Sequence, residues 1–271
     1  MTLTPTGHNV CVNGIRQHYL RYAGAGGPLV IVPGITSPAI TWGFVAERLA
    51  EVFDVYVLDV RGRGLSSSGP DLDYGLNAMA ADAVAFVAAL SLKDLTLLGH
   101  SMGARICARA MNMHAAGVKH LLMVDPPVSG PGRRAYPSKL PWYVDSIRLA
   151  TKGIDAEGMR AFCPSWTEEQ RALRAEWLHT CFEPAIVKAF NDFHNDDFHK
   201  DLPGLVMPAS LMIAGRGGVI EKVDLEEIAT LNPAVRTATV ENAGHMIPWD
   251  DLEGFLAAVN KLLGSSITIR T

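Results

Sequence analysis

The serine in Gly99-His-Ser-Met-Gly103 is the residue whose surroundings most clearly suggest chemistry. These five residues fit the pattern G-x-S-x-G, in which the glycines permit a tight turn from a strand into a helix. Such a turn exposes the serine hydroxyl, and the positive end of the following helix stabilises an oxyanion that forms beside it. A serine between glycines usually marks only a turn. Ser101 is therefore a candidate nucleophile that requires a base elsewhere in the chain.

A histidine directly after a predicted strand at 236–242 supplies the candidate base. A lone histidine in such a position is more often a surface residue or a satisfied core residue. His245, however, follows Ser101 in the chain order serine, acid, histidine that one group of catalytic triads takes. In that interpretation Ser101 attacks a carbonyl carbon, and His245 removes the hydroxyl proton and later delivers it to the leaving group. An acid would orient the imidazole.

The elements that must position these residues alternate between buried strands and helices. The dipeptide Asn13-Gly14 predicts a hairpin that begins the sheet. Continuous apolar runs predict strands that are covered on both faces, and periodic runs between them predict helices. Strands are expected at 10–12, 15–22, 28–33, 55–60, 95–98, 120–125, 209–215 and 236–242, and helices at 38–50, 76–90, 104–113, 225–230 and 252–263. This alternation predicts an α/β fold with a mostly parallel eight-stranded sheet flanked by helices.

Residues 129–204 interrupt this alternation. No strand is predicted there, short amphipathic helices are broken by prolines, and three tryptophans occur, at 142, 166 and 177. We expect this segment to form a helical cap inserted into a core domain made of residues 1–128 and 205–271.

The composition excludes several classes of function. The 271-residue chain has a net charge of −4 and no basic field for nucleic acid. Its first residues lack the features of a secretory leader, and no apolar stretch reaches the roughly 20 residues that span a bilayer. Four cysteines are scattered without a C-x-x-C pair, and the polar cluster at 192–199 lacks a recognised metal-ligand spacing. We expect a cytoplasmic protein without cofactor, metal, membrane or nucleic-acid partner.

Three further segments accompany the turn at Ser101 in a recognisable order. Pro33-Gly-Ile35 follows the third predicted strand, Asp59-Val-Arg-Gly-Arg-Gly-Leu-Ser66 follows the fourth, and Asn242-Ala-Gly-His-Met-Ile-Pro-Trp249 lies near the end. With these matches the chain resembles the α/β-hydrolase fold family over nearly its whole length. The resemblance implies a Ser-His-acid site and an oxyanion hole made by the backbone N–H groups of Ile35 and Met102.

The acid is where the sequence departs from the common pattern of that family. Most members carry Gly-x-x-Asp after the seventh strand, but this chain reads Gly215-Arg-Gly-Gly-Val-Ile-Glu221 there. Asp125 ends the sixth predicted strand, a place that some members use, and from there a carboxylate can approach the same imidazole. We favour Asp125 as the acid. Asp224 and Glu221 stay open as alternatives, and Asp125 could instead cap the turn at Pro126.

A closer resemblance bears on the substrate. Leu98-Gly-His-Ser-Met-Gly-Ala-Arg105, Met123-Val-Asp-Pro-Pro-Val-Ser-Gly-Pro-Gly-Arg-Arg-Ala-Tyr-Pro137 and Ala214-Gly-Arg-Gly-Gly218 are similar to segments of the N-formylmaleamate deformylases of aerobic nicotinate degradation. This resemblance implies a metal-independent serine hydrolase that cleaves the formamide bond of N-formylmaleamate to maleamate and formate, with Asp125 as the acid. It implies a small acidic amide as the substrate.

Three residues of the predicted cap are candidates for binding such a substrate. Arg133 or Arg134 could hold its carboxylate in a bidentate pair, although solvated surface is the more common place for such arginines. Trp142 could line a pocket, although helix packing alone would explain it. Two alternative functions remain: a carboxylesterase or carbon–carbon bond hydrolase that acts on another ring-cleavage product, and a hydrolase-fold receptor with slow or no turnover.

Overall fold

The computed structural model describes residues 4–270 and contains one eight-stranded sheet with the order β1-β2-β4-β3-β5-β6-β7-β8. The strands are β1 (Thr6–Val12), β2 (Ile15–Tyr22), β3 (Pro28–Val32), β4 (Asp54–Leu58), β5 (Leu95–His100), β6 (Val118–Val124), β7 (Ala209–Ala214) and β8 (Arg236–Val240). The six strands β3 to β8 run parallel to one another, whereas β1 and β2 are antiparallel to their neighbours. The predicted α/β fold with a mostly parallel eight-stranded sheet is confirmed.

The first two strands form the hairpin that the sequence predicts. Asn13 and Gly14 both have positive φ angles, 45° and 74°, as the two central residues of a type I′ turn require. The strand before the turn begins at Thr6, four residues earlier than its apolar pattern indicates, because the exposed half of β1 pairs with β2 as far as Thr6 and Arg21.

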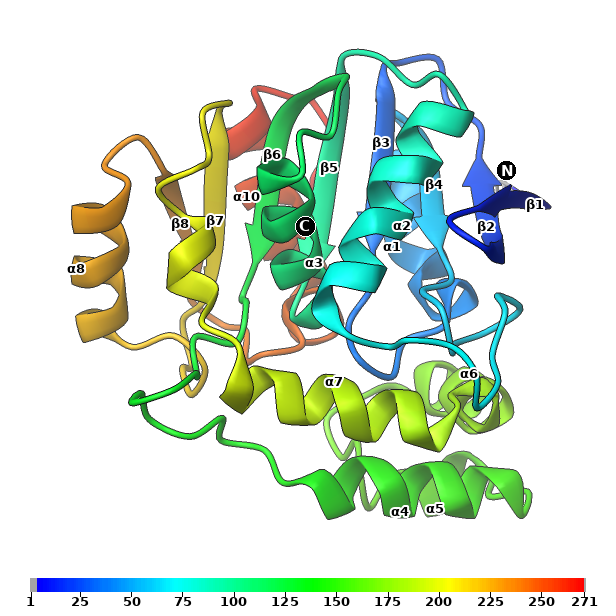
Figure 1. The fold of residues 1–271 in the computed structure, drawn as a ribbon. Coiled ribbons are helices and arrows are strands. Elements are labelled where there is room, and N and C mark those ends of the chain that lie inside the picture. The colour runs from blue at the N-terminus through cyan, green and yellow to red at the C-terminus, as the bar shows by residue number, and fades with distance from the viewer. Residues whose placement is uncertain (1–3, 271) are drawn as a thin grey trace.

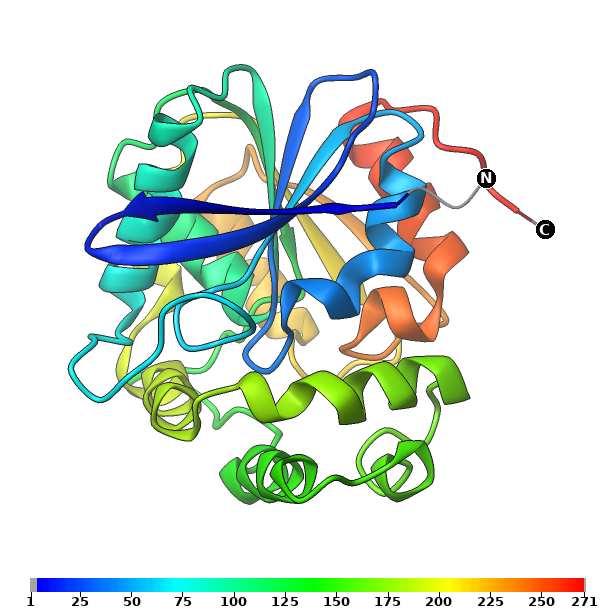
Figure 2. The same cartoon turned by 90° about the vertical axis from the view of Figure 1, so that its right-hand side faces the viewer.

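Helices cover both faces of the sheet (Figures 1 and 2). On one face, α2 (Leu76–Ala89), α3 (Met102–Asn112) and α8 (Lys222–Leu231) pack over one apolar cluster. On the other face, α1 (Gly43–Leu49) and α10 (Leu252–Leu263) pack over a second cluster. The short helices η1 (Ala39–Trp42) and α9 (Ile247–Asp250) precede α1 and α10. This three-layer arrangement covers the apolar strands on both sides, as parallel sheets require.

Only helices and loops lie between β6 and β7. These are α4 (Leu140–Thr151), α5 (Ala156–Met159), α6 (Glu168–Trp177), η2 (Leu178–Thr180), α7 (Glu183–Asn195) and η3 (Phe198–Asp201). In both ribbon views α4, α6 and α7 lie together beneath one end of the sheet (Figures 1 and 2). That end carries the carboxyl ends of β5 and β6, from which Ser101 and Asp125 project. The division into a core and a cap at residues 129–204 stays a prediction. Within residues 4–270, no helix has the length and apolar character that crossing a membrane requires.

Candidate active site

Ser101 occupies a strained turn between β5 and α3. Its φ and ψ angles are 55° and −119°, a conformation that L residues rarely adopt. The N–H of Ser101 donates to the carbonyl oxygen of Val124 at 2.8 Å, so the neighbouring strand β6 holds the turn. A Cβ at Gly99 would lie 2.3 Å from the carbonyl oxygen of Gly103, and a Cβ at Gly103 would lie 1.8 Å from that of Val32. Both glycines of the motif are therefore required by close backbone contacts.

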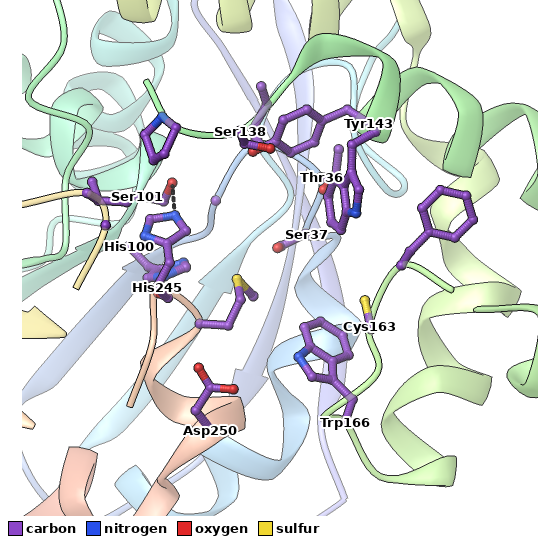
Figure 3. Close-up of a pocket in the computed structure, with 18 of the residues that line it drawn as sticks. Thr36, Ser37, His100, Ser101, Ser138, Tyr143, Cys163, Trp166, His245 and Asp250 are labelled. Carbon is purple, nitrogen blue, oxygen red and sulfur yellow. Dashed lines mark hydrogen bonds between the residues drawn. The ribbon is translucent and has the colours of Figure 1, made fainter. Parts of the chain in front are cut away.

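The structure brings Ser101, His245 and Asp125 into one hydrogen-bonded chain. Nε2 of His245 lies 3.0 Å from Oγ of Ser101, and Nδ1 of His245 lies 2.7 Å from Oδ2 of Asp125. Figure 3 shows His245 beneath the hydroxyl of Ser101, with the contact drawn as a dashed line. Asp125 is fully buried and has a φ angle of 43°, which turns its side chain out of the strand direction. This geometry allows Nε2 to accept the hydroxyl proton while the carboxylate fixes Nδ1–H.

Neither alternative acid approaches His245 by hydrogen bond or ion pair. Oδ2 of Asp224 accepts from the N–H of Glu221 at 2.7 Å and from Arg134 at 2.6 Å, and Glu221 is the N-cap of α8. Both carboxylates are therefore engaged at the start of a helix. Asp125 is the one of the three that contacts the imidazole.

His100 contacts both the backbone and the imidazole ring of His245. Its Nε2 lies 2.9 Å from the carbonyl oxygen of His245, and the two rings lie 5.2 Å apart. The pKa of His100 is lowered to about 3, mainly by burial and to a smaller extent by the charge of the neighbouring His245. His100 is therefore neutral at physiological pH and donates from Nε2 to the loop. Sequence reasoning did not assign it a role, although its place beside Ser101 in the motif was a usable signal.

The two proposed oxyanion donors, in the loop after β3 and at the start of α3, are carried by residues that one buried arginine contacts. Within residues 4–270 the N–H groups of Ile35 and Met102 donate to no protein acceptor, so both are free to bind an oxyanion. Gly34 is close enough to the nucleophile that a Cβ there would lie 3.5 Å from Cβ of Ser101. Nε of Arg63 donates to the carbonyl oxygen of Ile35 at 3.0 Å, and its Nη2 lies 3.4 Å from Sδ of Met102. Arg63 thus contacts both residues that carry the donors.

One tyrosine of the cap segment contacts the triad, and a second tyrosine contacts the first. The hydroxyl of Tyr136 lies 3.1 Å from Nε2 of His245, and the hydroxyl of Tyr143 lies 3.5 Å from that of Tyr136. Burial raises the pKa of Tyr136 well above its ordinary value, so this phenol stays protonated. A protonated hydroxyl at this position can donate a hydrogen bond to a substrate atom beside Ser101.

A pocket of about 470 Å³ opens over Ser101 and His245 between the core and the cap helices. This volume is typical of sites for small molecules. Ser101, His245, Ile35 and Trp142 are among the residues that line it, and the role of Trp142 in substrate binding stays a prediction. Figure 3 shows Thr36, Tyr143, Cys163 and Trp166 around the side of the pocket away from Ser101.

Arg133 and Arg134, by contrast, do not line the pocket. Arg133 forms a bidentate pair with Glu227 at 2.7 and 2.8 Å and a further bond to Asp197, and Arg134 binds Asp224 and the carbonyl oxygen of Val219. The expectation that they hold a substrate carboxylate is corrected on this ground. Their charges are already paired with Glu227 and Asp224 of α8 and with Asp197, the N-cap of η3.

A different arginine lies in the pocket wall. Arg174 of α6 is 4% exposed and donates to the carbonyl oxygen and to Oγ1 of Thr36, each at 3.1 Å. Sequence reasoning missed it. The available signal was its spacing from Arg171 and Ala175, which puts an arginine on the buried stripe of a cap helix.

The polar residues at 192–199 do not form a metal site. Asp197 caps η3 and pairs with Arg133, and Asp192 binds Lys188. Across residues 4–270 no three histidine, cysteine, aspartate or glutamate side chains gather in a way that could hold a metal ion.

Several known proteins are similar to this chain in sequence and in structure. The family model of the alpha/beta hydrolase fold matches residues 27–252. The N-formylmaleamate deformylase of Pseudomonas putida is 66% identical over 263 residues, which cover 97% of this chain and 98% of that protein. The crystal structure of an N-formylmaleamic acid deformylase variant from Pseudomonas putida S16 superposes with a TM-score of 0.91 at 57% identity and covers 94% of this chain and 100% of that chain.

A more distant structure shows how widely the fold is shared. The structure of E-2-(acetamidomethylene)succinate hydrolase has a TM-score of 0.79 but only 19% identity, over 97% of this chain and all of that one. At that identity the likeness concerns the fold alone. On the family match, the full-length relative and the site geometry together, the chain belongs to the alpha/beta hydrolase fold family.

Proposed function

We propose that this chain is a serine hydrolase that cleaves the formamide bond of N-formylmaleamate to give maleamate and formate. The observation that carries the substrate is the 66% identity to an N-formylmaleamate deformylase across 97% of the chain. The reaction class is supported separately, because Ser101, His245 and Asp125 form a continuous hydrogen-bonded chain at the floor of a small-molecule pocket.

The first half of the proposed reaction forms a formyl ester. Ser101 Oγ attacks the formyl carbon as Nε2 of His245 takes the hydroxyl proton, and Asp125 stabilises the resulting imidazolium through Nδ1. The oxyanion accepts hydrogen bonds from the N–H group of Ile35, in the loop after β3, and from that of Met102, the first residue of α3. These donors are part of the folded backbone, so their orientation costs no reorganisation during the reaction.

The chemistry of the substrate favours attack at the formyl group. The formyl carbon carries hydrogen in place of a carbon substituent and is the less hindered of the two carbonyl carbons of this imide. When the tetrahedral intermediate collapses, the C–N bond breaks and His245 delivers its proton to the nitrogen of maleamate. That nitrogen is a good leaving group because the adjacent carbonyl delocalises its charge. Water activated by His245 then attacks the formyl ester and releases formate.

The surroundings of the reaction form part of the proposal. All four cysteines are free, as is usual in a reducing compartment, so we place the reaction in the cytoplasm. We propose no metal or cofactor, since each proton transfer above is assigned to a protein side chain. The partner is a small acidic amide, and residues 129–204 form the cap that closes over it.

A substrate panel tests this function against its alternatives. Formate release from N-formylmaleamate is measured beside hydrolysis of p-nitrophenyl acetate and of a ring-cleavage diketone, each with and without EDTA. The proposal expects the highest kcat/KM with N-formylmaleamate, equal yields of formate and maleamate, and no effect of EDTA. Faster ester or diketone cleavage without formate would replace the deformylase with the hydrolase alternative. Tight binding with negligible turnover of every compound would favour a receptor.

A further inference from the structure

Arg174 is a buried cation without an acidic partner. No aspartate or glutamate oxygen within residues 4–270 forms an ion pair with its guanidinium, and its Nε has no hydrogen-bond partner. Two of its five N–H groups donate to Thr36, which leaves Nε–H and one N–H on each terminal nitrogen without a protein acceptor among residues 4–270. Burying a charge in this state is unfavourable unless another group compensates it.

Two indole rings hold the guanidinium in place. Its central carbon lies 5.5 Å from the ring centroid of Trp142 and 5.6 Å from that of Trp166. Both rings line the pocket together with Arg174. Cation–π contacts stabilise the charge and restrict the position of the side chain, but they do not neutralise it. The two indole rings therefore hold the planar guanidinium of Arg174 in one position and form a preorganised cationic site.

The position of this site relative to the nucleophile suits a short substrate. Arg174 binds Thr36, and the preceding residue, Ile35, carries one proposed oxyanion donor. The guanidinium is therefore bonded to the loop that carries this donor, and it lines the same pocket as Ser101. Among the described residues that line the pocket, Arg174 is the one arginine or lysine.

We propose that Arg174 is the specificity-determining residue that binds the carboxylate of the substrate, with Trp142 and Trp166 as the walls of this subsite. The proposal rests on the proposed deformylase function for the identity of the anion. N-formylmaleamate carries a carboxylate at the end opposite its formyl group, and Ser101 and Arg174 line one pocket. The remaining N–H groups of Arg174 supply charge-assisted hydrogen bonds to that carboxylate.

The other charged group in the pocket wall is separate from Arg174. Oδ2 of Asp250 accepts from the N–H of Gly244 at 2.9 Å, and this carboxylate forms no ion pair with Arg174. Figure 3 shows Asp250 away from Thr36, to which Arg174 is bonded. Asp250 therefore does not neutralise Arg174, which lines the pocket without an acidic partner among residues 4–270.

The experiment compares N-formylmaleamate with its uncharged methyl ester. Wild type is expected to prefer the carboxylate substrate, and Arg174→Gln is expected to lower kcat/KM for that substrate by about 100-fold, mainly through KM, as loss of a buried charge pair does. The kcat/KM for the methyl ester is expected to fall far less, so that Arg174→Gln no longer prefers the carboxylate substrate to the ester. Arg174→Lys is expected to restore part of it. Arg171→Gln is the matched control, because Arg171 is also buried on α6 but bonds to the carbonyl oxygens of Ala156 and Trp166 and does not line the pocket.

A binding measurement keeps the inference separate from the proposed function. Calorimetric titration of maleamate, with maleic diamide as the uncharged control, needs no turnover. We expect wild type and Arg171→Gln to bind maleamate about 100-fold more tightly than Arg174→Gln does. If wild type releases no formate but this difference is present, the deformylase function fails and the anion site stands. Equal maleamate affinity in wild type and in a folded Arg174→Gln variant overturns the anion site, whatever the formate assay gives.

Discussion

Replacement of Asp125 by asparagine tests the structural assignment of the acid. The side chain of Asp125 uses both oxygens: Oδ2 contacts Nδ1 of His245 at 2.7 Å, and Oδ1 lies 3.4 Å from the N–H of Ala214. Asparagine has one acceptor oxygen for these two donors. If its carbonyl faces Ala214, its NH₂ group faces Nδ1 and forces the tautomer in which Nε2 carries the proton. Nε2 then cannot take the proton of Ser101.

The expected cost follows from the loss of the correct tautomer and of the buried negative charge. We expect kcat to fall about 10⁴-fold, which corresponds to about 5.5 kcal/mol of transition-state stabilisation. KM is expected to change little, because Asp125 does not line the pocket. The side chains differ little in volume, so the variant is expected to fold, and circular dichroism checks this.

Asp224→Asn is the matched control in the same formate-release assay. Asp224 takes part in the capping of α8 and binds Arg134, so its replacement is expected to lower stability by about 1 kcal/mol and to leave kcat within a few fold. The reasoning is refuted if a folded Asp125→Asn enzyme keeps more than about a tenth of wild-type kcat, or if the Asp224 variant is the one that loses turnover.

Three further predictions concern the turn, the buried histidine and the arginine that the pocket excludes. Gly103→Ala is expected to cost at least about 3 kcal/mol in urea unfolding, because its Cβ would lie 1.8 Å from the carbonyl oxygen of Val32; Gly27→Ala, whose Cβ meets nothing within 4 Å, is expected to change little, and equal effects contradict this. The pKa of His100 is about 3 in the folded protein and near 6.5 in the unfolded chain. Between these values only the unfolded chain takes up the proton, so the free energy of unfolding decreases as the pH is lowered. From pH 7 to 5 wild type is expected to lose about 2 kcal/mol more than His100→Asn, and parallel urea curves disprove it. Arg133→Gln is expected to leave KM within about threefold, since Arg133 lies outside the pocket, and a rise of about 100-fold would restore it as the carboxylate ligand.

Much of the fold is contained in local sequence patterns. The apolar runs and the dipeptide Asn13-Gly14 predict the strands and the hairpin, and the bounds differ from those observed by a few residues at most element ends. The exposed start of β1 was missed because an edge strand needs no apolar residues on its outer half. Apolar periodicity reports burial, and the first half of β1 is not buried.

The candidate site was predictable only in part. Ser101 and His245 follow from motifs, and Asp125 follows from its place at the end of a strand, because chain order and strand ends decide where such side chains lie. Arg133 and Arg134 were candidates for binding a ligand carboxylate, but they pair with acidic residues that lie 64 to 94 residues away in the sequence. Such pairs between distant segments cannot be inferred from spacing. The same limit hid Arg174, whose Thr36 partner is 138 residues away.

Formate release by wild type and by Ser101→Ala tests the central claim most directly. The assay incubates purified protein with N-formylmaleamate and measures formate and maleamate together. The account predicts equal amounts of both products from wild type and a loss of at least about 10⁴-fold in rate when Ser101 is replaced in an otherwise folded protein. Absence of formate from the wild-type reaction, or turnover by Ser101→Ala near the wild-type rate, would contradict it.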